Sequence, residues 1–171
     1  MTTKLRQLLV IAGLTLAVPL GCKDKDADQA KAEVKVLDPA SNGSPISIEL
    51  VKFTGEGEGR GMEVLLYNTG DKTAVAYHFL FRYYDANDKL LKVKPGTPFE
   101  SDTDFTSMSG NKYKCEPKQN QTLEIDGVIV SVPADAVRAE IIASSVRTIA
   151  ADGNTIEDWW SQENFGEWPA G

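Results

Sequence analysis

The feature that most constrains the fold is Ala74–Asp85, AVAYHFLFRYYD, an almost unbroken run of strand-forming residues. One set of alternate positions is aromatic or β-branched: Val75, Tyr77, Phe79, Phe81 and Tyr83. A period of two is typical of a β-strand, because a helix would scatter these residues around its circumference. The intervening residues are also fairly apolar: Ala76, His78, Leu80, Arg82 and Tyr84. We therefore expect this strand to lie centrally in its sheet.

Other short strand-like runs precede and follow it, divided by turns rich in Asn, Asp, Gly and Pro. They are Ile46–Phe53, Met62–Asn68, Lys89–Lys94, Gln121–Ile125, Val137–Ile149 and Thr155–Trp160. Lys112–Glu116 is a further candidate, Val128–Val132 either extends the preceding strand or packs irregularly, and Thr97–Gly110 is expected to be a long polar loop. Regular turn spacing without a long helix predicts an all-β fold, a single immunoglobulin-like antiparallel β-sandwich of about seven to eight strands.

The glycine-rich run Thr54–Gly61, TGEGEGRG, invites comparison with a phosphate-binding loop. Such a loop needs a helix N-terminus behind it, and a P-loop also supplies Lys followed by Ser or Thr. Here a strand-like run follows and two glutamates lie inside the loop. We interpret it as a mobile hairpin loop.

The first 21 residues have the pattern of a secretory signal. Lys4 and Arg6 form a basic start, and Leu8–Leu20 is a 13-residue apolar stretch. At ~1.5 Å per residue this stretch spans about 20 Å, short of the ~30 Å hydrocarbon core of a bilayer. A cleaved signal is therefore favoured over a membrane helix.

The end of this segment, Pro19-Leu20-Gly21-Cys22, resembles the lipobox of bacterial lipoproteins, although Pro19 departs from the usual aliphatic residue. The resemblance implies cleavage before Cys22, a diacylglycerol on its sulfur and a further chain such as palmitate on its amine. Two or more acyl chains make membrane attachment stable. Lys23 in place of Asp favours the outer membrane over the inner membrane. The alternative is an ordinary signal peptide with an incidental cysteine.

Residues 23–45 are rich in Lys, Asp and Ala and lack an apolar stripe. Such composition predicts a solvated, flexible linker. The expected organisation is therefore a signal peptide over residues 1–21, a lipidated cysteine with a disordered tether over residues 22–45, and a β-sandwich with an aromatic tail over residues 46–171.

Phe81-Arg82-Tyr83-Tyr84-Asp85 resembles the FxLYD motif of a small bacterial and archaeal β-sandwich family, with Tyr83 in place of its Leu. The turns before and after the Ala74 strand resemble that family's strand boundaries, and the resemblance covers about residues 46–149. It implies an immunoglobulin-like fold in a cell-envelope protein. It implies no activity, because the family has no known catalytic residues to carry over.

Charge and composition exclude several functions. Lys and Arg number 18 and Asp and Glu number 25, giving −7, a surface that repels nucleic acid. His78 is the only histidine and no serine lies in a Gly-x-Ser-x-Gly elbow, so no catalytic triad is expected. We expect no enzyme activity, no catalytic residues and no cofactor.

Metal sites are not expected either. A blue-copper site needs two imidazoles and a thiolate. The set His78, Met62, Met108 and Cys115 supplies one imidazole, which leaves a cuprous site as a remote alternative. The acidic run Glu100–Asp104 lacks the glycine and distal glutamate of an EF-hand. We expect a solvated loop there and a structural role for His78.

Cys115 is the only cysteine left once Cys22 is acylated. We expect it to be a small buried residue. An intermolecular disulfide or a metal ligand remains as an alternative, and a Cys22–Cys115 disulfide would become available without lipidation.

The three tryptophans, Trp159, Trp160 and Trp168, all lie in the C-terminal tail. Adjacent residues of a strand point to opposite faces, so Trp159 and Trp160 should face different sides. Either the tail folds back and caps the sandwich, or its rings form a binding surface for a sugar or a protein.

These patterns together predict a non-enzymatic bacterial lipoprotein of the cell envelope. Its lipid anchor at Cys22 would hold the sandwich at the membrane for binding or scaffolding, with an envelope protein or glycan as partner. The alternative is a carbohydrate- or peptidoglycan-binding module that uses the tail tryptophans.

Overall fold

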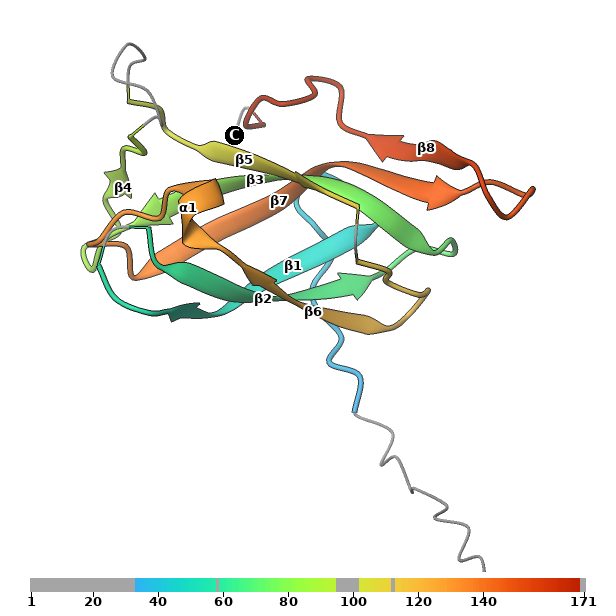
Figure 1. The fold of residues 1–171 in the computed structure, drawn as a ribbon, viewed down its shortest axis with the longest axis horizontal. Coiled ribbons are helices and arrows are strands. Elements are labelled where there is room, and N and C mark those ends of the chain that lie inside the picture. Colours follow the sequence, from blue (N-terminus) through green and yellow to red (C-terminus); the bar gives the residue numbers. More distant parts are fainter. Residues whose placement is uncertain (1–32, 58, 95–101, 112, 170–171) are drawn as a thin grey trace, which may run out of the picture. The chain divides into compact units, whose positions relative to one another are not determined.

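The computed structural model describes residues 33–57, 59–94, 102–111 and 113–169. Over these residues the chain is nearly all β, and eight strands form two antiparallel sheets (Figure 1). The predicted signal peptide and Cys22 lie outside the described residues. Within the described ranges, no helix is long and apolar enough to span a membrane.

One sheet has the order β1-β2-β6, with β1 at Ile46–Thr54, β2 at Gly61–Asn68 and β6 at Asn120–Ile125. The other has the order β4-β3-β7-β8, with β4 at Leu90–Leu91, β3 at Ala74–Tyr84, β7 at Arg138–Ile149 and β8 at Ile156–Ser161. β5 (Thr106–Gly110) also pairs with β3, and a short helix, α1 (Gly127–Val130), follows β6. The β2–β6 and β3–β7 pairs match the B–E and C–F pairs of immunoglobulin sheets. The predicted all-β sandwich is confirmed.

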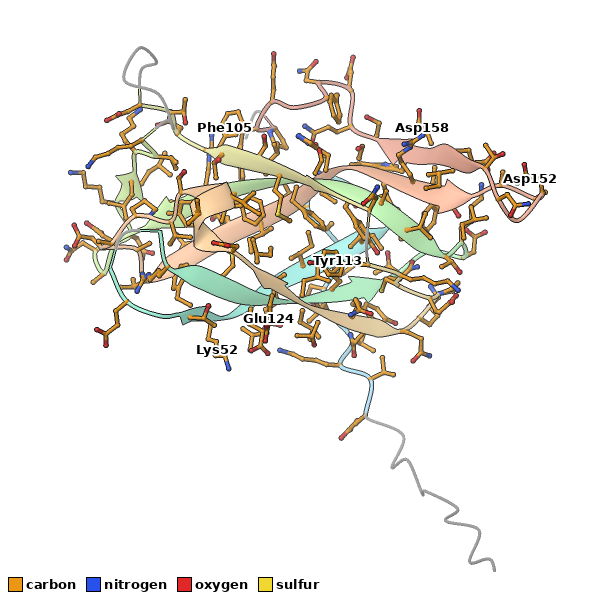
Figure 2. All side chains as sticks on the ribbon, in the orientation of Figure 1. Lys52, Phe105, Tyr113, Glu124, Asp152 and Asp158 are labelled. Carbon is orange, nitrogen blue, oxygen red and sulfur yellow. The ribbon has the colours of Figure 1, made fainter. Side chains whose placement is uncertain are left out.

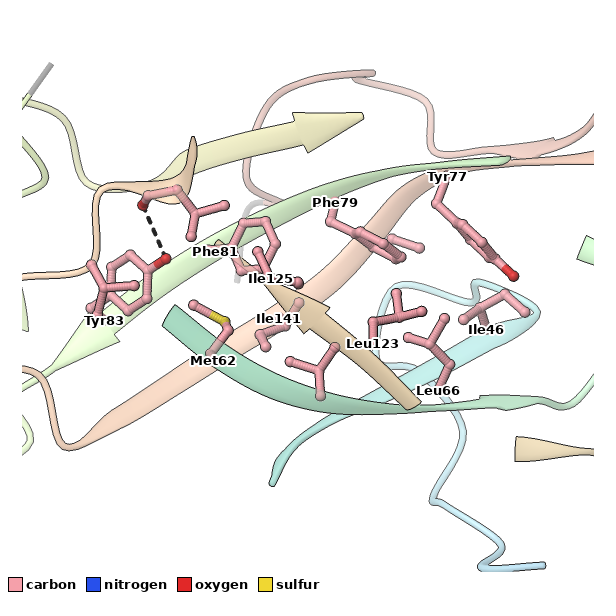
Figure 3. Packing of buried hydrophobic residues seen from close by; sticks show 14 of the residues in the cluster. Ile46, Met62, Leu66, Tyr77, Phe79, Phe81, Tyr83, Leu123, Ile125 and Ile141 are labelled. Atoms are coloured by element: carbon pink, nitrogen blue, oxygen red, sulfur yellow. Dashed lines mark hydrogen bonds between the residues drawn. The ribbon is translucent and has the colours of Figure 1, made fainter. Parts of the chain in front are cut away.

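β3 is the central strand that its sequence predicts. β7 pairs with it along its length on one edge, and β5 and β4 pair with it on the other. Its inward side chains, Tyr77, Phe79, Phe81 and Tyr83, are almost fully buried against β2, β6 and β7 (Figure 3). Burying each such side chain stabilises the fold by roughly 1.5–3 kcal/mol. The Tyr83 hydroxyl also donates to the Val130 carbonyl at 3.1 Å, so its one polar atom is satisfied.

The prediction of a polar loop over residues 97–110 was wrong at its C-terminal end, because Thr106–Gly110 forms β5. Its sequence, TSMSG, carries one large apolar residue, and therefore shows no alternation that a pattern search detects. The strand exists because its backbone pairs with the edge of β3 from Tyr77 to Phe81. Pairing with a strand already in place overrides weak local preference.

Three shorter expectations also differ from the structure. The strand expected at Lys89–Lys94 is only Leu90–Leu91, followed by a single bridge from Val93 to Thr103. Of the candidate Lys112–Glu116, the described residues contribute one bridge, from Cys115 to Ala74. Val128–Val132 neither extends β6 nor packs irregularly, because the Asp126 carboxylate accepts the Val128 N–H and begins α1 there.

The glycine-rich run is the hairpin connection between β1 and β2, as predicted. The C-terminal part of this run, Gly59 and Arg60, contacts the segment that follows β6. The Gly59 N–H donates to the Val132 carbonyl at 3.0 Å, and Gly127 lies directly against the Arg60 carbonyl. The carbonyl of Arg60 occupies the space where any other residue at position 127 would place its Cβ atom.

The part of the expected tether that the structure describes, residues 33–45, contacts the sandwich. The Lys35 backbone and the Asn120 side chain exchange two hydrogen bonds, and Leu37 is buried. The Asn42 side chain donates to the Ala143 carbonyl at 2.8 Å. The compact unit accordingly begins at Glu33, twelve residues before the expected end of the tether at residue 45.

Candidate functional site

The C-terminal tail, residues 162–169, folds back across the outer face of the five-stranded sheet. Phe165 lies over His78, with ring centroids 4.7 Å apart, and the Arg82 guanidinium lies 4.3 Å from the centre of the Trp168 ring. His78 and Arg82 occupy the face of β3 opposite its core residues. Trp168 also contacts Phe105, which Figure 2 places on the same side of the domain as Asp158. The tail therefore covers part of this face.

Gln162 shapes the tail. Its N–H donates to the Ser144 carbonyl at 3.0 Å, and its side-chain amide donates to the carbonyls of Asn164 and Glu167 at 2.8 and 2.6 Å. Gly166 has φ of +78°, a left-handed conformation that glycine adopts without strain. These bonds bend the chain away from the line of β8 and onto the sheet.

Trp159 and Trp160 are separated by an irregularity in β8. Asp158 lies opposite Arg147 and Trp160 opposite Val146, so Trp159 is an extra, bulged residue. A Cβ added at Gly70 would lie 2.4 Å from the Trp159 ring, which shows that this ring rests on the glycine backbone. Trp159 thus fixes β8 to the turn between β2 and β3.

An open pocket of about 640 Å³ lies beside the outer-face residues His78 and Arg147, and Trp160, which is half-buried and packs against the core, also lines it. The other principal lining side chains are Phe165, His78, Arg147 and Asp158. Phe165 is 57% exposed although it contacts the His78 ring. The structure therefore places one of the three predicted tryptophans, Trp160, at a pocket with the exposed Phe165 ring beside it.

The pocket also carries charged groups. Arg147 and Asp158 are opposite each other on β7 and β8 and form an ion pair, Nε to Oδ1, of 2.9 Å. Asp158 is 87% exposed, and such surface pairs contribute at most about 1 kcal/mol to stability. Arg147 also donates to the Ile156 carbonyl at 3.2 Å, and its remaining donors and the exposed Asp158 carboxylate are able to hydrogen-bond a ligand.

His78 lies at the base of the pocket beneath Phe165. Its Nδ1 atom lies 2.5 Å from the Ser144 hydroxyl. Partial burial lowers the pKa of His78 below its ordinary value of 6.5, because the imidazolium loses hydration there. At neutral pH the ring is therefore uncharged, and the expected structural role agrees with these contacts.

The suggested copper residues are not brought together. His78 lies on the outer face of the sheet, whereas Met62 and Cys115 are buried in the core between the sheets. Among the residues that the structure describes, no three His, Cys, Asp or Glu side chains are grouped as metal ligands. In the acidic run, Asp104 pairs with Lys92 at 2.5 Å, and Glu100 lies outside the described residues.

Cys115 is the buried thiol that the sequence predicts. It is fully buried, and its thiol donates to the Gln119 carbonyl with a sulfur–oxygen distance of 3.4 Å. Burial raises the pKa of Cys115 to about 11, so the thiol is protonated at neutral pH. A protonated, inaccessible thiol is a poor nucleophile and a poor metal ligand.

Sequence reasoning missed Phe165, Arg147 and Asp158 as members of this pocket. Arg147, Asp158 and Trp160 lie on neighbouring strands, but their proximity depends on the β7–β8 register and on the bulge at Trp159. Phe165 reaches the pocket only through the turn that Gln162 and Gly166 make. No local pattern reports either feature.

The residues that the structure describes form an antiparallel β-sandwich domain with an open pocket at its surface. No protein-family model matches the sequence, and no curated protein matches it. A solved structure that is similar is that of a DUF1425 family member from Shewanella sp. pv-4. It is 20% identical, with 63% of this chain and 83% of that chain covered and a TM-score of 0.33. A likeness at this level carries no argument about function.

Proposed function

We propose that this chain is a lipid-anchored protein of the bacterial cell envelope whose β-sandwich is a non-catalytic binding domain. The proposed anchor is Cys22, which follows a basic start, a 13-residue apolar stretch and the sequence Pro-Leu-Gly. Its acyl chains would hold the protein at the membrane, with Lys23 favouring the outer membrane. Residues 23–32 would then separate the sandwich from the lipid surface.

The observation that carries a binding function is the pocket of Trp160 and Phe165. Ligand sites combine apolar walls with a few placed polar groups, and this pocket offers the exposed Phe165 ring and the half-buried Trp160 beside a guanidinium and a carboxylate. A saccharide fits this combination best. The C–H face of a sugar packs against an aromatic ring, and its hydroxyls pair with planar charged side chains.

Of the three tail tryptophans, we propose only Trp160 as a ring that contacts a saccharide. Trp159 packs on Gly70, and Trp168 is occupied by Arg82 and Phe105. A flat platform of three rings is therefore not present, and a saccharide would contact Trp160 and Phe165. Scaffolding of an envelope protein is the second candidate, and the unpaired edge of β7 from Arg138 to Ala143 favours it.

The anchor is tested by labelling cells with radioactive palmitate and measuring the intact mass of the membrane-extracted protein. We expect label on the wild type, a mass that begins at Cys22 with two or three acyl chains, and neither feature in Cys22→Ala. An unlabelled, soluble wild-type protein would contradict the proposal.

The pocket is tested by binding of soluble peptidoglycan fragments and a glycan array to the purified protein. We expect Trp160→Ala and Phe165→Ala to weaken binding at least tenfold, whereas the matched variant Trp168→Phe should leave it unchanged. Absence of binding to every glycan, or binding that survives Trp160→Ala, would exclude a saccharide site here.

A further inference from the structure

The five-stranded sheet is incomplete at one edge. β8 pairs with β7 only from Ser145 to Ile149, although β7 begins at Arg138. The last backbone bond along this edge joins Gln162 to Ser144, after which the tail turns away. Among the described residues, Arg138–Ala143 therefore has β3 on one side and no strand on the other.

A groove of about 930 Å³ lies along this open edge. One wall is β7 from Arg138 to Ile142, and the other is β1 from Ser47 to Phe53, the edge strand of the opposite sheet. β1 and β7 contact each other where the two sheets meet at this edge. Asp38–Asn42 and Trp168 also line the groove. The volume is near the upper end of the ~300–1,000 Å³ typical of ligand sites.

The backbone along the open edge is arranged for another strand. The Ala143 carbonyl accepts a hydrogen bond from the Asn42 side chain and therefore points away from β3. Along an antiparallel strand, the backbone N–H and C=O groups of successive residues point to opposite edges. Those of Ile141 and Ala139, two and four residues before Ala143, therefore also point into the groove. No backbone partner for them lies within the described ranges. Such free donors and acceptors are what a strand added to a sheet pairs with.

The side chains of the groove indicate the chemistry of an occupant. Val51 is 48% exposed and Val137 is 58% exposed, one on each wall. Each glutamate of the groove has its charge neutralised by an ion pair, Glu49 with Lys35 and Glu140 with Arg138. Asp38 has no ion-pair partner in the described part of the chain. An occupant that buries the valines and neutralises the aspartate is both apolar and basic.

We propose that this groove binds an extended segment of a partner protein, which adds to β7 as a strand in line with β8. The segment has apolar residues at alternate positions and at least one Lys or Arg. The unpaired length, about six residues at ~3.3 Å each, accommodates roughly 20 Å of extended chain. A second copy of this protein is disfavoured because it carries the same net charge of −7. This site is separate from the Trp160 pocket, and its test does not depend on saccharide binding.

The test is selection of a random heptapeptide phage library on the purified full-length protein. We expect enriched peptides that alternate apolar residues with polar ones and contain lysine or arginine. The double variant Val51→Lys with Val137→Lys should weaken binding of the enriched peptide at least tenfold. Val128→Lys is the matched control, because Val128 is 78% exposed on α1, away from the groove, and should leave binding unchanged.

A second measurement separates strand addition from ordinary apolar contact. The enriched peptide is synthesised with N-methyl groups on alternate amides, which remove backbone donors and leave the side chains in place. We expect one of the two methylation registers to abolish binding. Equal binding of both registers, no enrichment from the library, or equal binding by the double variant would overturn the proposal. A wild-type dimer in sedimentation that the double variant dissociates would assign the groove to a second copy instead.

Discussion

Replacing Gly127 with alanine tests how the glycine-rich connection is held. A Cβ at position 127 would lie 1.8 Å from the Arg60 carbonyl oxygen and 2.2 Å from that of Gly59. Real Cβ atoms keep at least about 3.0 Å from such atoms, so the two backbone segments must separate by more than 1 Å. This movement strains the 3.0 Å bond from Gly59 to the Val132 carbonyl.

The expected cost follows from these contacts. Overpacking at a tight site costs roughly 1–3 kcal/mol, and loss of a backbone hydrogen bond adds about 1 kcal/mol. We therefore expect Gly127→Ala to lower the free energy of unfolding by about 3 kcal/mol. At about 2.1 cal/mol/K per residue, a domain of roughly 140 residues loses about 10 °C in Tm.

The assay is thermal unfolding followed by circular dichroism, with Gly110→Ala as the matched control. A Cβ at Gly110 would lie 3.8 Å from the Tyr113 ring, an ordinary contact, so this variant should unfold within a few degrees of the wild type. A Tm for Gly127→Ala within 2 °C of the wild type, roughly 0.6 kcal/mol, would refute the argument from close approach.

Three further predictions follow from buried groups. Tyr83→Phe removes the hydrogen bond to the Val130 carbonyl and should lower the free energy of unfolding in urea by about 1–2 kcal/mol, whereas an unchanged urea midpoint would contradict this role. Cys115, whose pKa burial raises to about 11, should resist iodoacetamide in the folded protein and react fully in urea, as mass spectrometry would show; rapid labelling of the folded protein would oppose this. Because the pKa of His78 is lowered in the folded state, the unfolded chain binds its proton more readily, and stability should fall as the pH drops below 6.5. His78→Gln should reduce the slope of unfolding free energy against pH in that range, and an identical slope would count against a contribution from His78.

Much of the fold is predictable from local pattern. The bounds of β3 agree with the expected strand because its two faces are apolar and turn residues flank it. β1, β2, β6 and β7 agree with expectation to within one residue at each end, because apolar residues alternate along them and turn residues flank them. β5 and α1 were missed, because one depends on pairing with β3 and the other on a single capping carboxylate.

The candidate site is less predictable. The sequence draws attention to Trp159, Trp160 and Trp168, but a bulge, a glycine and an arginine decide their environments. The bulge at Trp159 sets Trp160 opposite the buried Val146, beside the pocket. Each of these contacts joins residues distant in sequence, so spacing along the chain does not encode them.

The sequence by itself determined the long strands, although not β5, since alternation and turn chemistry are local properties that a single chain displays. It also determined that the chain has few side chains suited to metal binding or nucleophilic chemistry, of which Cys115 is one. Only the tertiary structure decided that β8 stops halfway along β7, and that the tail crosses the outer face instead of completing the sheet. Strand pairing, register and the path of the tail depend on contacts between distant segments. Those contacts form the Trp160 pocket and leave the groove beside β7 open.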